Sequence, residues 1–205
     1  MLEVENVGCV RGDRRLFSNI SFSLLPGTFL QLTGANGSGK TSLLRIICGL
    51  MAPEEGQIRW QGANIRALGE EYSTAINYIA HQNGLKEELT SLENLRISTG
   101  LAGTEISRNE AYNVLGKFGL GGRENLAARL LSEGQRRRSA LARILTRSAT
   151  LWLLDEVFTS LDKAAVSLMK LLIEEHLGEA GMAIVATHQE LNIDAGLFQR
   201  LELAS

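Results

Sequence analysis

The fold class is decided by the stretch Gly34-Ala35-Asn36-Gly37-Ser38-Gly39-Lys40-Thr41, which has the form GxxxxGK[ST]. It follows a strand-like segment, residues 29–33, and precedes a helix-like segment, residues 41–50, which is the context this motif requires. The glycines let successive backbone N–H groups point at phosphate oxygens, and the helix adds its positive N-terminal end. The stretch therefore predicts a phosphate-binding loop of an α/β domain, in which Lys40 reaches the β and γ phosphates and Thr41 ligates Mg2+.

A second motif ends an apolar segment, Leu151-Trp152-Leu153-Leu154, with the two acids Asp155 and Glu156. Parallel sheets build their sites at the carboxyl ends of strands. Successive side chains there diverge, so Asp155 is expected to hold Mg2+ while Glu156 faces the attacking water as general base. An apolar strand with a terminal acid often marks only a surface turn, but here it follows a phosphate loop at the spacing of a nucleotide-hydrolysing enzyme.

A third motif is Leu131-Ser132-Glu133-Gly134-Gln135, in which a serine hydroxyl and glycine N–H groups begin a helix and form a second anion-binding helix end. The stretch resembles the LSGGQ signature of ABC ATPases. That resemblance implies a P-loop NTPase fold of the ABC ATPase type, with a mixed sheet core, an inserted helical subdomain and an N-terminal antiparallel β region. It also implies a head-to-tail dimer of two copies, which sandwiches two ATP molecules so that each signature acts on the other copy's ATP.

Other positions match the family along most of the chain. The resemblance implies that Gln82 is the Q-loop residue that touches Mg2+ and the attacking water, that Ser160-Leu161-Asp162 is the D-loop that reports across the dimer, and that His188 is the switch histidine at the γ-phosphate. His81 and His176 are interpreted as surface or packing residues. The expected sets are catalytic Glu156, His188 and Gln82; Mg2+-binding Thr41, Gln82 and Asp155; and nucleotide-binding Gly34, Ala35, Asn36, Gly37, Ser38, Gly39, Lys40, Thr41, Ser42 and Arg11.

The chain departs from the family pattern at several places. Arg11 stands where an aromatic residue usually stacks on adenine, so its guanidinium is expected to lie on the base. Glu133 replaces a glycine of the signature and is expected to point to solvent and interact favourably with the helix dipole. Val157 replaces a proline after the catalytic glutamate, which removes no catalytic atom, so hydrolysis is still expected. The arginines at 136–138 are interpreted as a solvated helix face.

The coarse organisation indicates one domain over residues 1–205, with a core at about 1–82 and 150–205 and a helical subdomain at about 85–145. Glycine-separated short helices, including one at 106–118, predict the helical part. The core is expected to hold two hairpin-like strands in residues 2–32 around Pro26-Gly27, an edge strand at 56–62, a helix at 163–177 and an apolar parallel strand at 182–186.

Composition narrows the class of protein. The chain has 21 Lys and Arg against 23 Asp and Glu, so no charge excess for nucleic acid or an anionic membrane is present. Apolar runs are shorter than the roughly 20 residues that span a bilayer, and the first residues lack the pattern of a signal peptide. The two cysteines, Cys9 and Cys48, form no metal motif and are expected to be reduced. We therefore expect a cytoplasmic protein that reaches the membrane through a partner.

The expected branch of the ABC family is inferred from the spacing between the motifs and from short stretches that resemble one subgroup. Only a short segment separates Lys40 from Ser132, which leaves no room for the long coiled coil of DNA-repair members, and only a short tail follows His188. One cassette is present, unlike the two of translation factors, and fused membrane helices are absent. Several stretches are similar to the haem exporter ATP-binding subunit of the cytochrome c maturation system, namely residues 16–22, 58–62, 81–86, 92–95 and 151–156.

This subgroup resemblance implies a peripheral translocase subunit on the cytoplasmic face of a bacterial inner membrane. Its implied partners are the integral membrane subunits CcmB and CcmC, and ATP hydrolysis would drive release of a haem-loaded periplasmic chaperone. Residues 83–103 are expected to form the groove for the membrane partner's cytoplasmic helix. Two alternatives stay open, which are an ATPase subunit of another importer, exporter or lipid-extraction system, and a non-transport ATP switch.

Overall fold

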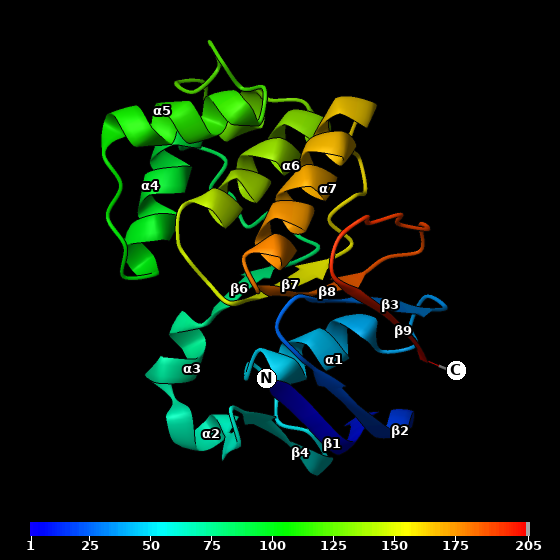
Figure 1. The fold of residues 1–205 in the computed structure, drawn as a ribbon. Helices are drawn as coiled ribbons and strands as arrows, with labels where there is room; N and C mark the ends of the chain where they lie inside the picture. Colours follow the sequence, from blue (N-terminus) through cyan, green and yellow to red (C-terminus); the bar gives the residue numbers. More distant parts are fainter. Residues whose placement is uncertain (204–205) are drawn as a thin grey trace. The chain divides into compact units, whose positions relative to one another are not determined.

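The computed structural model describes residues 1–203 and divides the chain into two compact units (Figure 1). The core unit comprises Met1–Tyr78, Ala149–Glu156 and the chain from Ile173 onward, and the helical unit comprises Ile79–Ser148 and Val157–Leu172. The sequence-based division placed residues 157–172 in the core. In the structure they group with the helical unit, where Ser160 bonds to Glu133 and Asp162 pairs with Arg138.

The core unit contains a four-stranded antiparallel sheet in the order β2-β1-β4-β5. Its strands are β1 (Leu2–Arg11), β2 (Arg14–Leu24), β4 (Glu55–Trp60) and β5 (Ala63–Asn64). The sequence predicted that residues 56–62 would form an edge strand, and this is wrong, because β5 pairs along the outer side of β4. Positive φ angles of 51° at Gln61 and 85° at Gly62 form the two-residue turn that returns the chain.

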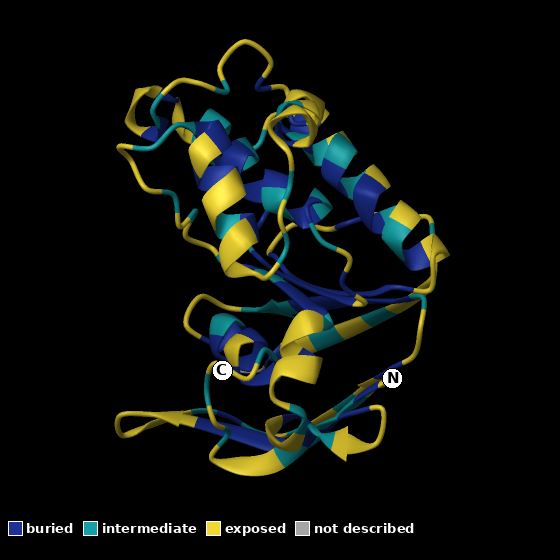
Figure 2. Ribbon diagram, turned by 90° about the vertical axis from the view of Figure 1, so that its left-hand side faces the viewer, coloured by how far each residue is buried: buried dark blue, intermediate teal, exposed yellow. Residues whose placement is uncertain are grey.

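The second sheet of the core unit has the order β6-β7-β8-β3-β9, and the β3–β8, β3–β9 and β7–β8 pairs are parallel. Its strands are β3 (Thr28–Gly34), β6 (Ile76–Ile79), β7 (Leu151–Asp155), β8 (Met182–Ala186) and β9 (Leu197–Leu203). Every residue of β7 and β8 is buried, as the uniformly apolar segments 151–154 and 182–186 predicted, and Figure 2 shows the central strands in dark blue.

Helix α1 (Lys40–Ile47) lies between the two sheets of the core unit and contacts β1, β3 and β7 (Figure 1). Apolar side chains cover several of its faces and join the main hydrophobic core, since sheets flank the helix on both sides. The helix is shorter than the predicted 41–50. It ends because Gly49 is left-handed (φ 78°) and its N–H bonds to the carbonyl of Ile46, while the N–H of Leu50 bonds to the carbonyl of Arg45.

Short helices connect the sheets of the core unit and build the helical unit. In the core unit α2 (Ile65–Leu68) and α3 (Glu70–Thr74) precede β6. The helical unit holds α4 (Ser91–Leu101), α5 (Arg108–Lys117), η1 (Ala128–Leu130), α6 (Glu133–Leu141) and η2 (Ala142–Leu145). Helix α7 (Lys163–Gly178) begins in the helical unit and ends in the core unit.

Three helices of the helical unit start with the same local device. Thr90, Ser107 and Ser132 each cap a helix through the side-chain oxygen, and the residue three positions later returns a bond to the cap N–H. These reciprocal bonds satisfy backbone donors that an open helix end leaves unpaired, so the helix starts are encoded locally. Over residues 1–203, no helix combines the length and apolar character that crossing a bilayer requires.

Candidate active site

The phosphate loop joins β3 to α1, where two glycines occupy positions that no larger residue fits. Gly34 has φ 142°, and a Cβ there would lie 2.7 Å from the carbonyl oxygen of Leu203 and from Ser38 Oγ. Gly39 has φ 103°, and its Cβ would lie 2.8 Å from the ring of Phe17. Tight backbone packing and left-handed geometry together account for the glycines of the motif.

Three charged or titratable side chains from three segments meet beside this loop in the core unit. The Nζ of Lys40 donates to the carbonyl oxygen of Gly34 at 2.9 Å and lies 3.1 Å from Nε2 of His188. The Oε1 of Glu156 lies 3.9 Å from Lys40 Nζ and 3.3 Å from His188 Nε2. Lys40 and Glu156 are mostly shielded from solvent, whereas 46% of the His188 side chain is exposed. The structure thus brings together the expected lysine, base and switch histidine.

The contacts of His188 demand two different proton positions. An ammonium only donates, so Nε2 accepts when it bonds to Lys40, whereas Nε2 must carry a proton to donate to the carboxylate of Glu156. One ring nitrogen fills one of these roles at a time. His188 therefore bonds to Lys40 when Nε2 carries no proton and to Glu156 when Nε2 carries one.

Strand pairing sets the positions of the two acids. Asp155 ends β7 opposite Ala186, the last residue of β8, so the chain after β8 brings His188 to the same edge of the sheet. Asp155 is 1% exposed. Glu156 follows in a left-handed conformation (φ 50°), and its N–H donates to the carbonyl oxygen of Ala186 at 2.9 Å. A non-glycine residue held in this conformation beside a reactive group is a frequent feature of functional sites.

The phosphate loop contains a buried hydroxyl that is suited to bind a phosphate group. Ser38 is 2% exposed, and its Oγ has no hydrogen-bond partner within residues 1–203. A buried hydroxyl next to the start of α1 and to the Lys40 ammonium is suited to donate to a phosphate oxygen. The half-buried Thr41 and the carboxylate of Asp155 belong to the same unit and are oxygen donors of the kind that Mg2+ prefers.

Arg11, the expected adenine-stacking residue, is exposed at the end of β1. It pairs with Arg14 across the turn that leads into β2. Arg11 belongs to the core unit, as does the phosphate loop. The planar guanidinium of an exposed arginine can stack on a base.

Of the other expected site residues, Ser42 is buried in α1 of the core unit, whereas Gln82, the signature and the D-loop belong to the helical unit. Ser132 caps α6, so the signature begins this helix, and Gln135 completes the reciprocal bond. The loop of Gln82, the signature and the D-loop together line a polar pocket of about 260 Å³. Its lining residues are His81, Gln82, Asn83, Glu133, Arg137, Thr159 and Ser160. The structure therefore gathers the second group of motifs around one end of α6.

Two expectations about α6 need correction. Glu133 is exposed in the first turn, as expected, but its Oε1 accepts a hydrogen bond of 2.9 Å from Ser160 Oγ rather than pointing only to solvent. The solvated face predicted for residues 136–138 is wrong at Arg137, which is 3% exposed. Arg137 lies one turn after Glu133, and this i, i+4 spacing was the available sign that both share a face. Arg138 pairs with Asp162 at 3.8 Å.

His176 is a packing residue of the core unit. Its ring stacks on Trp152 with centroids 4.0 Å apart and an interplanar angle of 5°, and its Nε2 lies 3.2 Å from the carbonyl oxygen of Met182. Burial lowers the pKa of His176, because the charged imidazolium loses water there. His81 is exposed, and its backbone carbonyl faces Arg137.

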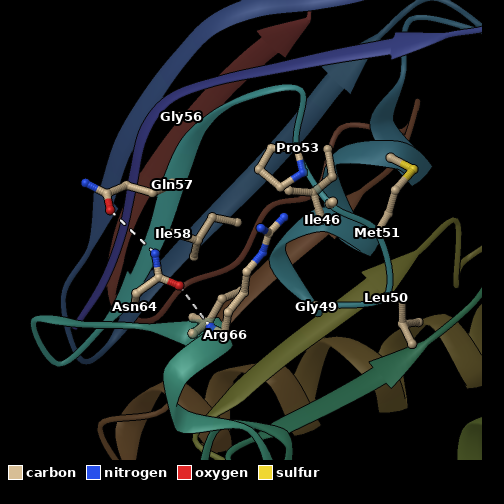
Figure 3. Close-up of a pocket in the computed structure, with 12 residues that line it drawn as sticks. Ile46, Gly49, Leu50, Met51, Pro53, Gly56, Gln57, Ile58, Asn64 and Arg66 are labelled. Carbon is tan, nitrogen blue, oxygen red and sulfur yellow. Dashed lines mark hydrogen bonds between the residues drawn. The ribbon is translucent and has the colours of Figure 1, made fainter.

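A separate pocket of about 350 Å³ lies in the core unit between the end of α1, β4 and the start of α2 (Figure 3). Asn64 connects its walls, since its side chain donates to Gln57 Oε1 at 3.5 Å and accepts from the N–H of Arg66. Leu50, at the opposite wall, is 67% exposed. These walls come from segments beyond the phosphate loop, so the pocket is distinct from the phosphate site.

Comparison with known proteins agrees with this geometry. The ABC transporter family model matches residues 17–159. The cytochrome c biogenesis ATP-binding export protein CcmA of Nitrosomonas europaea is 54% identical over 93% of this chain and 90% of its own length. The CcmA of Nitrosospira multiformis is 51% identical over 98% of both chains. Among solved structures, the dimeric ATP-binding cassette MJ0796, bound to ADP and Pi, superposes with a TM-score of 0.78 and 26% identity over 92% of this chain and 88% of its own.

The matched region contains the phosphate loop, the signature and the strand that ends in Asp155 and Glu156. The two CcmA relatives cover nearly the whole chain, including the segment that carries His188. The expected fold class is thereby confirmed at the level of the sequence family and of the three-dimensional structure. The chain belongs to the ABC transporter family of ATP-binding subunits and, within it, to the CcmA group.

Proposed function

We propose that the chain is the ATP-hydrolysing subunit of a haem exporter complex of cytochrome c biogenesis, where hydrolysis drives release of a haem-loaded periplasmic chaperone. The observation that carries the ATPase assignment is the meeting of Lys40, Glu156 and His188 beside the phosphate loop. The names of the 54% and 51% identical relatives support the cytochrome c role.

Each residue of the core site has a task in hydrolysis. The ammonium of Lys40 and the N–H groups of the loop bind the β and γ phosphates, and Ser38 Oγ donates to a phosphate oxygen. The carboxylate of Glu156 takes a proton from the water that attacks the γ-phosphorus, while His188 contacts the γ-phosphate and orients that water. Thr41, Asp155 and Gln82 would hold Mg2+, which neutralises charge on the phosphates when bound.

The signature and the D-loop complete the site in a dimer of two copies. Ser132 Oγ accepts from the N–H of Gln135 and still has a proton to donate to the γ-phosphate of ATP bound by the other copy. In support, the similar cassette MJ0796 was solved as a dimer with ADP and Pi. Gly134 and the D-loop residues Leu161 and Asp162 would contribute to the dimer surface, whereas Leu131 is buried beneath the start of the signature.

The membrane partners would be CcmB and CcmC, with the chain bound peripherally to the cytoplasmic face of the inner membrane. The groove proposed for a partner helix spans residues 83–103. Two exposed apolar residues one turn apart on α4, Ile97 and Leu101, support this, because they would lose water on docking. They are 48% and 86% exposed, respectively.

Replacing Glu156 by Gln tests the catalytic assignment. The amide keeps the size of the side chain but accepts no proton, so ATP turnover of the membrane complex is expected to fall by about 10² to 10⁴. The Kd for ATP, measured by equilibrium binding, should stay near that of the wild type. Glu175→Gln, at an exposed position of α7, serves as the matched control. Near-normal turnover in Glu156→Gln would falsify its role as base.

The cytochrome c role is tested in the cell. Deletion of the gene is expected to abolish assembly of c-type cytochromes, detected by haem staining, and the wild-type chain but not Glu156→Gln should restore it. Purification from membranes, with identification of the bound subunits, tests the proposed partners. Intact c-type cytochromes in the deletion strain would favour another transport system, and absence of ATPase activity with the membrane subunits present would favour an ATP switch.

A further inference from the structure

The buried guanidinium of Arg137 holds the loop that carries Gln82. Its Nη1 lies 3.1 Å from the carbonyl oxygen of Ala80, 3.0 Å from that of His81 and 3.1 Å from Oδ1 of Asn83. These acceptors flank Gln82 on both sides. One side chain of the signature helix therefore bonds to the backbone just before the residue that the proposed mechanism places at Mg2+ and the attacking water, and to the side chain of the residue just after it.

The energetics make this connection stiff. Arg137 is 3% exposed, and a buried guanidinium is tolerated only while its donors are bonded. Moving residues 80–83 away from α6 would leave a buried charge without these acceptors, which is far more costly than breaking an exposed bond. The Gln82 side chain itself is exposed, so it keeps rotational freedom while its backbone is held.

The same helix also holds the D-loop one turn earlier. Glu133 Oε1 accepts from Ser160 Oγ at 2.9 Å, and Ser160 has a left-handed backbone with φ 63°. The carbonyl oxygen of Ser160 lies so close to Gly134 that a Cβ there would be 3.1 Å away. Glu133 and Arg137 thus anchor the D-loop and the Gln82 loop, respectively, to the first two turns of α6.

We infer that Arg137 is a positioning residue for Gln82, which couples the placement of Gln82 at one ATP to the signature helix that serves the other ATP. This inference rests on the proposed function, because it takes the roles of Gln82 and of the signature from it. Any displacement of α6 then carries the backbone of Gln82 with it. Loss of Arg137 should affect the hydrolytic step rather than the affinity for ATP, since the phosphate loop belongs to the core unit.

The experiment compares Arg137→Met with Arg136→Met, the same substitution at the half-buried neighbouring position. In the full-length chain bound to its membrane partners, Arg137→Met should lower kcat by about 10- to 100-fold, a size typical of lost residues that orient a metal-site ligand. The Kd for ATP should change by less than about twofold, which is the limit of independent sites. Arg136→Met should resemble the wild type in both constants.

A double-mutant cycle separates positioning from a general loss of structure. In a Gln82→Ala background, Arg137→Met should reduce kcat by no more than about twofold further, because the side chain that it positions is already gone. An equal further loss in both backgrounds, or a wild-type kcat in Arg137→Met, would overturn the inference.

Two further variants, Arg137→Lys and Glu156→Gln, test the inference if Arg137→Met does not fold or if the proposed function is wrong. Where Arg137→Met does not fold, the cycle is run with Arg137→Lys, which keeps the charge but loses the planar fork of donors, and the same additive result counts against the inference. The ATP turnover of Glu156→Gln distinguishes failure of the proposed function from failure of the positioning role of Arg137. Activity retained there refutes the proposed function, whereas activity lost there but retained in Arg137→Met refutes only the positioning role.

Discussion

At the scale of single residues, Lys40 and Glu156 form an ion pair beside the phosphate loop. The two charges lie 3.9 Å apart and are mostly shielded from water, so each lowers the electrostatic cost of the other. A bound γ-phosphate would compete with Glu156 for Lys40, leaving the carboxylate available to water. The left-handed backbone of Glu156 (φ 50°) keeps it at the strand end despite local strain.

Arg11 allows a prediction about the base of the nucleotide. If the exposed guanidinium stacks on adenine, Arg11→Ala should raise the Kd for ATP about 2- to 5-fold, as loss of an exposed cation–π contact of roughly 0.5 to 1 kcal/mol requires. Isothermal titration gives this Kd directly. Arg14→Ala removes the arginine opposite Arg11 in the same hairpin and should leave the Kd unchanged. An unchanged Kd in Arg11→Ala would refute stacking.

At the scale of elements, β7 and the end of α7 are joined by the stacked rings of Trp152 and His176. Trp152 is buried and His176 is half-buried, and Trp152 belongs to the strand that ends in Asp155. Burial favours the neutral form of the imidazole, which lowers the pKa of His176 below its ordinary value. The contact between the strand and the helix is therefore sensitive to protons.

This sensitivity predicts a pH dependence of stability. Because the folded pKa of His176 lies below the unfolded value of about 6.5, the unfolded chain binds the proton more readily. The contribution of His176 to the free energy of unfolding is thus complete above about pH 6.5 and is lost as pH falls towards the folded pKa, by at most about 1.4 kcal/mol per pH unit. Urea titrations at several pH values measure it.

Matched variants test the assignment to this ring. His176→Phe keeps an aromatic ring on Trp152 but binds no proton, so its unfolding free energy should change less between about pH 7 and pH 5 than that of the wild type. His81→Gln, which replaces an exposed histidine, should retain the wild-type slope. Equal slopes in all three proteins would show that His176 is not the responsible group.

At the scale of the whole molecule, the candidate catalytic groups divide between the two units. The core unit contains the phosphate loop, Asp155, Glu156 and His188, and the helical unit contains Gln82, the signature and the D-loop. Each unit has its own helix start that is proposed to bind phosphate, at α1 and at α6. In two copies arranged head to tail, the start of α6 of one copy would contact the ATP bound at the start of α1 of the other copy.

Ser132→Asp tests this arrangement without opening the helix. Aspartate is also a good helix cap, so α6 should remain formed, while the new carboxylate would repel the γ-phosphate of the other copy's ATP. In the Glu156→Gln background, ATP should drive dimer formation with Ser132 present and fail to do so with Ser132→Asp, as measured by size-exclusion chromatography with light scattering. The Kd for ATP of the monomer should be retained.

The control for that experiment is Ser107→Asp, an equivalent substitution at the cap of α5. It adds the same charge to the same unit at a helix that carries no signature, so ATP-driven dimers should still form. If Ser132→Asp formed dimers as readily as Ser107→Asp, the signature would not contact ATP across the interface.

The sequence alone predicted the phosphate loop, the start of the signature helix and the apolar segments 151–154 and 182–186. These depend on local rules, such as the glycine spacing at 34–39, the serine that caps a helix at Ser132, and uniform hydrophobicity in the two segments. Family resemblance added candidate roles for Gln82 and the other site residues. Helix ends and the short strand β5 were less predictable, because single turns decide them.

Only the tertiary structure decided which distant residues meet. The distances among Lys40, Glu156 and His188 arise from the pairing of β3, β7 and β8, which no local pattern contains. The sequence predicted that Arg137 is solvated, but it is buried. The carbonyl groups of residues 80–81 accept hydrogen bonds from its guanidinium there. Burial and hydrogen bonding are properties of a residue's three-dimensional neighbours, which is why Arg137 and Glu133 acquired their contacts only in the folded chain.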